Sequence, residues 1–192
     1  AYPRSLETAT GKQRMMDAPE VIDDLRFNPP MAATGNDWVL VSDRVMGGVS
    51  SGTMSRETVA GRKALRMRGE VSLDNNGGFL QVALDLGVSG DEVDARKWAG
   101  IRLDVFRNGQ AYNLHFRTSD IRRPWESYRQ GFHAPSDWTT VFLPFDSFTP
   151  HRTDQALNLS RLRRLGVVAI GRAFEADIAI AEIRFYAPNV AN

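Results

Sequence analysis

The sequence predicts an all-β protein, a sandwich or a barrel, on three observations. Short runs in which apolar and polar residues alternate recur about every ten residues from Glu20 onward, which is the spacing of strands in such folds. Gly, Asn, Asp and Pro separate these runs, as tight turns between strands require. No long segment repeats apolar residues with the period of an α-helix, so we expect helices to be few and short.

The N-terminal half contains a polar tail and four predicted strands. Residues 1–19 are polar and unpatterned, and we interpret them as a tail or a strap on the surface. Strands are predicted at 21–27, 38–42, 63–71 and 79–86. The turn Asn76-Gly77-Gly78 precedes the last of them, because Asn and Gly tolerate the positive φ that tight turns need. Residues 87–96 are predicted to form a loop or a short helix.

The clearest pattern lies at the centre of the chain. Two alternating runs, 101–105 and 112–116, flank Asn108-Gly109, a dipeptide typical of two-residue hairpin turns. The sequence therefore predicts a hairpin with one buried and one polar face. If the strands pair across this turn, the polar face combines Arg102, Asp104, Asn113, His115 and Arg117. Tyr128 and Arg129 are expected to join it from the next strand.

Three further strands complete the predicted domain. They span 138–145, 165–170 and 177–186. Ser160 is expected to cap one helical turn over 160–164. We therefore predict a single β-sandwich domain over residues 20–187, followed by a short C-terminal tail at 188–192.

Composition and charge exclude several classes of protein. The chain has 192 residues, 42% of them hydrophobic and 24% charged, which suits one globular domain with a substantial core. A formal net charge of +1 gives no reason to expect nucleic acid as a partner, and no apolar run is long enough to span a membrane. The absence of cysteine excludes disulfides, thiolate metal sites and cysteine nucleophiles. A cysteine-free chain suits the cytoplasm and the periplasm equally, so the compartment stays open.

No catalytic or cofactor motif is present, so we predict that the protein is not an enzyme. The glycine-rich segment 46–52 lacks the lysine of a phosphate-binding loop and is interpreted as a tight structural loop. None of the three histidines has the spacing of a metal site, and no G-x-S-x-G motif presents a nucleophilic serine. Asp23 and Asp24 lie in a first strand expected to pair with the last, which contains Glu182. A structural calcium ion between them is the one cofactor to test.

The polar face of the predicted hairpin admits two interpretations. Arginine, aspartate, histidine and tyrosine side chains on one sheet face suit sugar hydroxyls or a carboxylate. The same residue types also form the cross-strand ion pairs of an ordinary solvated sheet. Exposed aromatic rings would favour a binding site, and Trp98, Trp125 and Trp138 are the candidates. Trp98 and Trp138 begin predicted strands, so we expect them in the core.

A distinctive block follows Trp38. It runs Ser42-Asp43-Arg44-Val45-Met46-Gly47-Gly48-Val49-Ser50-Ser51-Gly52. Further blocks follow in order: Gly69-Glu70-Val71-Ser72-Leu73, Asn76-Gly77-Gly78-Phe79, Tyr128-Arg129-Gln130, Leu143-Pro144-Phe145 and Ile183-Arg184-Phe185-Tyr186. Together these blocks, over residues 20–187, resemble the complex I intermediate-associated protein 30 family, with this chain as a bacterial member.

The resemblance implies a fold and a function. The implied fold is a galactose-binding-like jelly roll, two antiparallel sheets packed face to face, which carbohydrate-binding modules share. The implied function is a non-catalytic interaction module that binds a protein partner, since mitochondrial members are assembly chaperones for respiratory complex I. Two alternatives remain: a domain that binds carbohydrate or another small ligand through the polar sheet face, and an enzyme that uses Asp104, His115, Arg117 and Tyr128.

An apolar or glycine-rich surface near residues 43–52 is the expected contact for a partner. The family-motif loops comprise Asp43, Met46, Gly47, Gly48, Ser50, Asn76, Gly77 and Gly78. Asp43 and Asn76 are expected to hold these loops through hydrogen bonds from backbone groups to their side chains.

Overall fold

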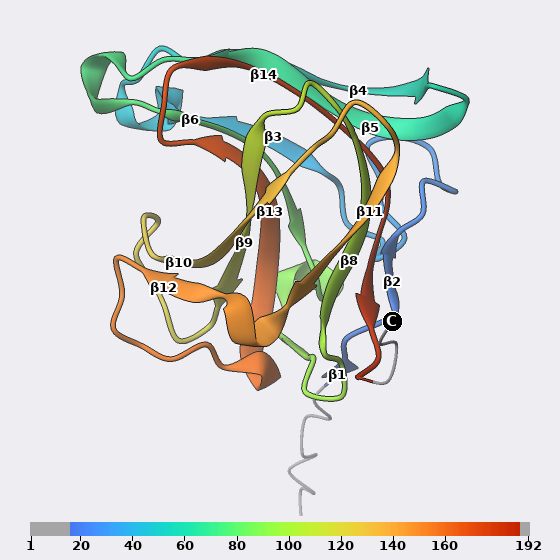
Figure 1. Cartoon of the computed structure of the whole chain (residues 1–192). Helices are drawn as coiled ribbons and strands as arrows, with labels where there is room; N and C mark the ends of the chain where they lie inside the picture. Colours follow the sequence, from blue (N-terminus) through green and yellow to red (C-terminus); the bar gives the residue numbers. More distant parts are fainter. Residues whose placement is uncertain (1–15, 189–192) are drawn as a thin grey trace, which may run out of the picture.

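The computed structural model describes residues 16–188 and confirms the predicted all-β sandwich of two sheets (Figure 1). Helical structure in this range is limited to five 3-10 turns of three or four residues: η1 (Asp43–Met46), η2 (Asp74–Asn76), η3 (Val88–Gly90), η4 (Phe145–Ser147) and η5 (Leu159–Arg161). No helix among these residues is long and apolar enough to cross a membrane.

The larger sheet, sheet A, has eight strands within the described range. They are β1 (Met16–Asp17), β3 (Val39–Ser42), β6 (Phe79–Asp85), β7 (Val93–Asp94), β9 (Ala111–Thr118), β10 (Ser127–His133), β12 (Thr149–His151) and β13 (Leu162–Ile170). From β3 the pairing runs through β6, β13, β9 and β10 to β12, and β7 and β1 attach at the start of β13. Apart from the parallel pair of β1 and β7, the pairs are antiparallel.

The smaller sheet, sheet B, has six strands among the described residues. They are β2 (Val21–Asp23), β4 (Ser51–Val59), β5 (Arg62–Val71), β8 (Gly100–Arg107), β11 (Thr139–Pro144) and β14 (Phe174–Tyr186). The order is β11-β8-β14-β5-β4, and β2 pairs with β14 near its end. In Figure 1, β9, β10 and β12 of sheet A lie on the left, and β2, β8 and β11 of sheet B lie on the right.

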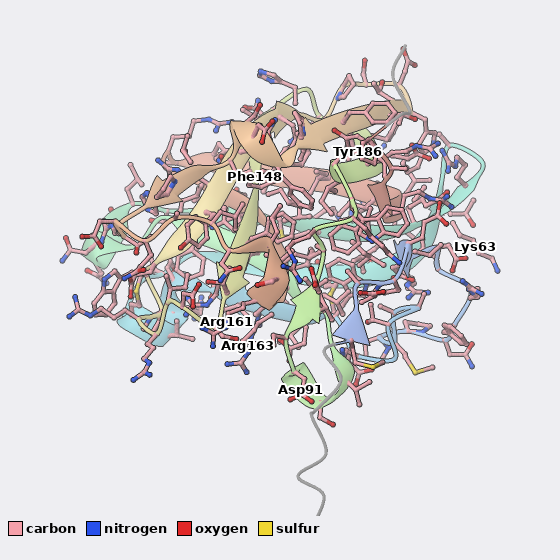
Figure 2. The ribbon with its side chains drawn as sticks, turned by 90° about the horizontal axis from the view of Figure 1, so that it is seen from below. Lys63, Asp91, Phe148, Arg161, Arg163 and Tyr186 are labelled. Carbon is pink, nitrogen blue, oxygen red and sulfur yellow. The ribbon has the colours of Figure 1, made fainter. Side chains whose placement is uncertain are left out.

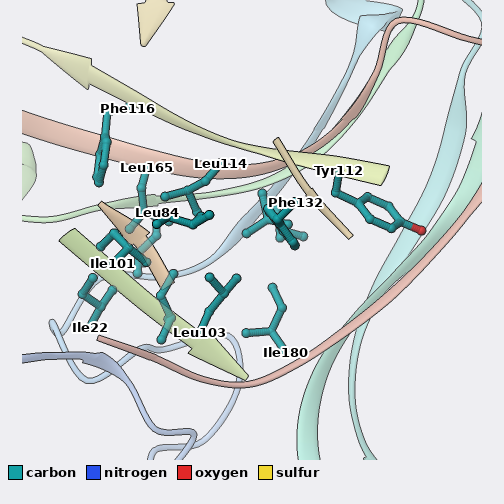
Figure 3. Packing of buried hydrophobic residues seen from close by; sticks show 14 of the residues in the cluster. Ile22, Leu84, Ile101, Leu103, Tyr112, Leu114, Phe116, Phe132, Leu165 and Ile180 are labelled. Carbon is teal, nitrogen blue, oxygen red and sulfur yellow. The ribbon is translucent and has the colours of Figure 1, made fainter. Parts of the chain in front are cut away.

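The core fills the space between the two sheets. Tyr112, Leu114 and Phe116 alternate along β9 and face Ile101 and Leu103 of β8, and all five side chains are fully buried (Figure 3). Burial of one such side chain stabilises the fold by about 1.5–3 kcal/mol. The period-2 alternation therefore predicts the inner face of each strand correctly.

Two glycines of sheet B allow a side chain of sheet A to approach closely. Gly52 on β4 lies directly opposite Gly69 on β5, and the side chain of Leu80 from β6 fills the space that side chains would occupy there. A Cβ atom at Gly69 would lie 2.1 Å from the carbonyl oxygen of Ser51. Strands β4 and β5 can pair here, under Leu80, only because both positions lack a side chain.

The predicted central hairpin is wrong. Strand β8 pairs with β11 and β14 in sheet B, whereas β9 pairs with β10 and β13 in sheet A. The Asn108-Gly109 turn therefore crosses from one sheet to the other. The backbone hydrogen bonds of the turn go to another loop and not to a hairpin partner. Arg107 N–H donates to Pro135 O and Gly109 N–H donates to Ala134 O, both at 2.7 Å.

Three local expectations also need correction. The first strand ends at Asp23 and not at residue 27, because Leu25 has φ = 63° and donates its N–H to the Asp23 carboxylate at 2.9 Å. The predicted helical turn is η5, and its cap is Asn158, whose side chain accepts a hydrogen bond from Ser160 N–H at 3.1 Å. Residues 87–96 contain η3 and the short strand β7.

Part of the predicted N-terminal tail belongs to the sheet. Strand β1 pairs with β7 through Met16 and Val93. The rest of that tail, 1–15, and residues 189–192 of the C-terminal tail lie outside the described residues. The expected pairing of the first predicted strand with the last is confirmed, since Asp23 of β2 lies opposite Ile183 of β14.

Candidate functional site

The motif loops meet at the buried carboxylate of Asp43. This residue begins η1 directly after β3, where the Ser42 hydroxyl caps the turn by accepting a hydrogen bond from Arg44 N–H. Asp43 has no exposed surface. Its carboxylate accepts hydrogen bonds from Ser50 N–H at 2.9 Å and Gly78 N–H at 2.6 Å, and also from the Ser50 hydroxyl. One side chain thus joins the loop after β3 to the loop before β6.

Two of the motif glycines make room for this carboxylate. A Cβ atom at Gly48 would lie 2.5 Å from Asp43 Cγ, and one at Gly77 would lie 2.4 Å from Asp43 Oδ2. Both positions therefore need glycine for the close approach of the backbone. Gly47 differs, because it ends η1 with φ = 86° and has open space around it.

The expected side-chain hydrogen bond of Asn76 is not found among the described residues. Asn76 instead contributes a left-handed backbone conformation, with φ = 58°, which Asn tolerates better than most residues. The prediction for Asp43 is confirmed by its four backbone and side-chain donors, the fourth being Phe79 N–H at 3.3 Å.

The hydrogen bonds keep Asp43 ionised. Burial alone would raise the pKa of its carboxyl, but the hydrogen bonds from Ser50, Gly78 and Phe79 outweigh burial and hold the pKa below its ordinary value. The carboxylate is therefore a charged, fully bonded anchor, and it is not available to a ligand.

Four apolar side chains project into solvent from the loops that Asp43 joins. We call them the loop patch: Val45, Met46, Val49 and Leu73. Their exposed fractions are 74%, 57%, 43% and 51%. Met46 was among the sequence-predicted residues; the other three were not. The sequence signal for Val45 and Val49 is their position among the glycines of the turn after β3, where no strand buries them. Leu73 is a lone apolar residue in a polar loop and carries no such signal.

The residues predicted to share one polar face lie on opposite sides of the molecule. Arg102 and Asp104 project from the outer face of sheet B, and Asn113, His115 and Arg117 project from the outer face of sheet A, with the core between them. Period-2 alternation places each side chain outward correctly. It does not say to which sheet a strand belongs, so the grouping was wrong.

Asp104 and Tyr128 have structural roles. The Asp104 carboxylate accepts hydrogen bonds from Arg62 Nη2 at 2.9 Å and from the Thr140 hydroxyl at 2.6 Å. The prediction that Tyr128 joins the polar face is wrong: it alternates with Arg129 on β10 and so faces the core with no exposed surface. Its hydroxyl donates to Ala156 O at 3.2 Å. Neither side chain is free to meet a ligand.

Arg117 holds a loop over the outer face of sheet A. One nitrogen of its guanidinium, Nη1, donates to the carbonyl oxygens of Arg123, Pro124 and Glu126 at 2.8–3.0 Å. This loop presents Trp125, which is half exposed. Trp98 and Trp138 are only partly buried: Trp98 packs against the core, whereas Trp138 packs on Phe106 outside it.

His115 and Arg129 are direct neighbours on sheet A. Arg129 lies opposite His115 on β10, and Gly166 lies opposite it on β13. Nε2 of His115 is buried and has no hydrogen-bond partner among the described residues. Burial, followed by the charges of Arg129 and His151, lowers the pKa of His115 to about 3, so its ring is neutral at neutral pH.

The acidic residues considered for calcium are engaged by protein donors. The Asp23 carboxylate accepts from Trp38 Nε1 at 2.7 Å and lies 3.6 Å from Arg56, and Glu182 pairs with Arg184. Within residues 16–188, no group of three or more His, Cys, Asp or Glu side chains is placed to hold a metal ion.

Comparison of sequences identifies one family. The model of the family described as "Complex I intermediate-associated protein 30 (CIA30)" matches residues 25–180. No curated protein matches the chain.

Comparison of structures finds carbohydrate-binding modules. A family 11 module of the cellulosomal cellulase Lic26A-Cel5E of Clostridium thermocellum has a TM-score of 0.69 and 14% identity, over 88% of this chain and 95% of that chain. A family 30 module of a second Clostridium thermocellum cellulase, Cel9D-Cel44B, has a TM-score of 0.59 and 13% identity, over 91% and 96%. An exo-beta-agarase has a TM-score of 0.57 and 9% identity, over 88% of this chain and 25% of that chain. At these identities the likeness concerns the fold alone.

Proposed function

Because the chain belongs to the complex I intermediate-associated protein 30 (CIA30) family, we propose that it is a non-catalytic interaction module that binds a protein partner, in the manner of an assembly factor. The loop patch is the contact surface in this proposal. The observation that carries it is the exposure of Val45, Met46, Val49 and Leu73 on loops joined by one buried carboxylate.

Exposure of this kind is unfavourable unless it serves binding. A cluster of exposed apolar side chains on a soluble domain marks an interaction surface, and burial of each side chain against a partner contributes about 1.5–3 kcal/mol. The hydrogen bonds to Asp43 order the loops before the partner arrives. Little conformational entropy is then lost when the complex forms.

Crosslinking of variants in native lysate tests the proposal. The double variant Val45→Asp/Met46→Asp places two charges in the loop patch, and Val88→Asp is the matched control, because Val88 is 66% exposed on η3, outside the loop patch. We expect wild type and Val88→Asp to capture the same protein and the double variant to recover about tenfold less of it. Equal recovery by all three proteins, with unchanged melting temperatures, would refute the loop patch as the contact.

A second candidate function uses the outer face of sheet A. This surface would bind a carbohydrate or another small polar ligand, and the unpartnered Nε2 of His115 beside Asn113 favours it. The fold that the chain shares with carbohydrate-binding modules supports the same candidate. Loss of ligand binding in His115→Ala, with the fold retained, would support it; a wild-type protein that binds neither a sugar nor another small polar ligand in calorimetry would count against it.

A further inference from the structure

Cations without acidic partners gather on the outer face of sheet A. Arg129 on β10 lies opposite Thr149 on β12, two residues before His151, and its charge acts on the imidazoles of both His115 and His151. Arg152 follows His151 in the chain and acts on the His151 imidazole alone. No ion pair among the described residues includes Arg129 or Arg152. Arg161 differs, because it pairs with Glu92 and Asp120. Figure 2 shows Arg161 and Arg163 close together, on the opposite side of the view from Lys63.

Strand pairing fixes the geometry of this surface. Arg129 lies opposite His115 on one side and opposite Thr149 on the other, so the three side chains form a row across β9, β10 and β12. Directly opposite residues on one face have Cβ atoms about 5 Å apart. On β13 the row continues with Gly166, which lies opposite His115. The side chain of Gln81 covers this glycine: a Cβ atom at Gly166 would lie 2.5 Å from Gln81 Oε1.

The nearby acidic groups are already engaged. Asp85 on β6 lies 4.0 Å from Arg164 of β13, and the Glu126 carboxylate accepts a hydrogen bond from Arg123 N–H at 3.0 Å. The positive charge of Arg117 is directed at three loop carbonyls. Arg129 and Arg152 therefore form no ion pair within the described residues, and the acidic group near Arg152 is Glu126, whose carboxylate hydrogen-bonds to Thr153, the next residue, and to Arg123 N–H.

From this arrangement we propose that the outer face of sheet A binds an oxyanion, a carboxylate or phosphate group of a small ligand, between Arg129 and Arg152. A guanidinium group binds such oxyanions with two parallel hydrogen bonds. The neutral ring of His115 lies directly beside Arg129, and its buried Nε2 has no hydrogen-bond partner within residues 16–188. This inference narrows the second candidate function to one ligand class and does not depend on the loop patch.

The bound anion has a spectroscopic signature. Arg129 contributes to the low pKa of both His115 and His151. A negative charge beside Arg129 offsets that contribution, so the pKa of both histidines must rise when the ligand binds. Histidine ring signals in an NMR titration, recorded with and without ligand, measure these values directly.

The experiment compares three probes: inorganic phosphate, glucuronate and glucose. We expect phosphate or glucuronate to bind the wild-type protein in calorimetry and to raise the pKa of His115 and His151, and glucose to do neither. Binding of phosphate alone or glucuronate alone identifies which oxyanion the site accepts. Binding of glucose without binding of either anion would overturn the oxyanion class while leaving the second candidate function in place. Failure of all three probes would overturn both.

Two variants with the same change of charge test the location. Arg129→Gln is expected to weaken anion binding by about tenfold or more. Arg102→Gln removes the same charge from the outer face of sheet B, and we expect it to bind as the wild type does. Equal weakening in both variants would mean that anion binding depends only on the overall charge of the protein. The proposed location at Arg129 would then be refuted. If Arg129→Gln does not fold, the wild-type protein tests the location by itself. A rise in the pKa of His115 and His151 on anion binding supports the site, and unchanged pKa values refute it.

Discussion

Asp43 is the residue on which the order of the loop patch depends. Replacement by alanine leaves the N–H groups of Ser50, Gly78 and Phe79 without their acceptor inside the protein. Hydrogen bonds to a charged group contribute about 1.5–3 kcal/mol each, and a buried donor without a partner is costly. We expect Asp43→Ala to lower the free energy of unfolding by about 3 kcal/mol, measured by urea denaturation.

Asp74→Ala is the control for this change. Asp74 lies in the neighbouring turn η2, and its side chain is exposed, so its loss is expected to change stability by less than about 0.5 kcal/mol. Similar stability of both variants would show that the Asp43 carboxylate does not anchor the loops.

His115 makes stability depend on pH. Burial, Arg129 and His151 lower the pKa of His115 from 6.5 to about 3 in the folded protein. Below pH 6.5, His115 is therefore protonated in the unfolded chain but stays neutral in the folded protein. Stability is therefore lost as the pH falls from 6.5 towards 3. Between about pH 7 and pH 5, above the range in which carboxylates titrate, we expect a loss of about 1–2 kcal/mol.

Urea denaturation at the two pH values measures this loss. His115→Gln should reduce it, whereas the same change at the exposed His133 on the same face of sheet A should not. His151, whose pKa is also lowered by burial, Arg129 and Arg152, accounts for a remaining slope. An unchanged pH dependence in His115→Gln would mean that its ring does not exclude the proton.

At the scale of elements, alternation predicts which face of a strand is buried but not which strand lies beside it. Strands β8 and β9 both show the alternation of apolar and polar residues, and their inward residues are correctly predicted. The Asn108-Gly109 turn suits a hairpin and an arch between sheets equally well. The choice depends on the distant carbonyls of Ala134 and Pro135, which accept from this turn. No local pattern encodes that contact.

The pairing of β4 with β5 rests on a residue without a side chain. A Cβ at Gly69 would meet the Ser51 carbonyl at 2.1 Å and Leu80 at 2.8 Å, so Gly69→Ala must separate the strands or displace Leu80. We expect a loss of about 2–4 kcal/mol in chemical denaturation. Gly131→Ala on β10 is the matched control, since its Cβ would meet Asn113 at an ordinary 3.6 Å. Equal effects would show that Gly69 is replaceable.

At the scale of the whole molecule, the sequence predicts the sandwich because both layers carry the period-2 pattern over a common core. The blocks that resemble the family also contain the two loops that Asp43 joins, the loop after β3 and the loop before β6. The grouping of the outward polar residues was predicted only in part, because His115 and Arg129 do share a face, whereas Arg102 and Asp104 lie on the other sheet. Long-range topology, which places distant strands side by side, separates the two groups.

Tyr112 links the two sheets of the molecule. It projects from β9 of sheet A, and its hydroxyl lies at the end of the core cluster (Figure 3), where it accepts a hydrogen bond from Asp177 N–H on β14 of sheet B at 2.9 Å. The same hydroxyl lies 2.8 Å from Asn108 Oδ1. Tyr112→Phe keeps the buried ring but leaves the Asp177 N–H without a partner. We expect it to lower the free energy of unfolding by about 1–3 kcal/mol and to speed amide exchange at Asp177.

Tyr128→Phe distinguishes this link from the general loss of a tyrosine hydroxyl. Tyr128 is as fully buried as Tyr112, but its hydroxyl bonds within its own side of the molecule, to Ala156 O at 3.2 Å and to Thr118 of β9. Ala156 is exposed, so water can replace the lost donor, and we expect a cost below about 1 kcal/mol. If the two variants lose the same stability, and amide exchange at Asp177 does not change, the sheets are held together by apolar packing alone. A larger loss in Tyr112→Phe, with faster exchange at Asp177, means that one hydroxyl couples the unfolding of sheet A to that of sheet B.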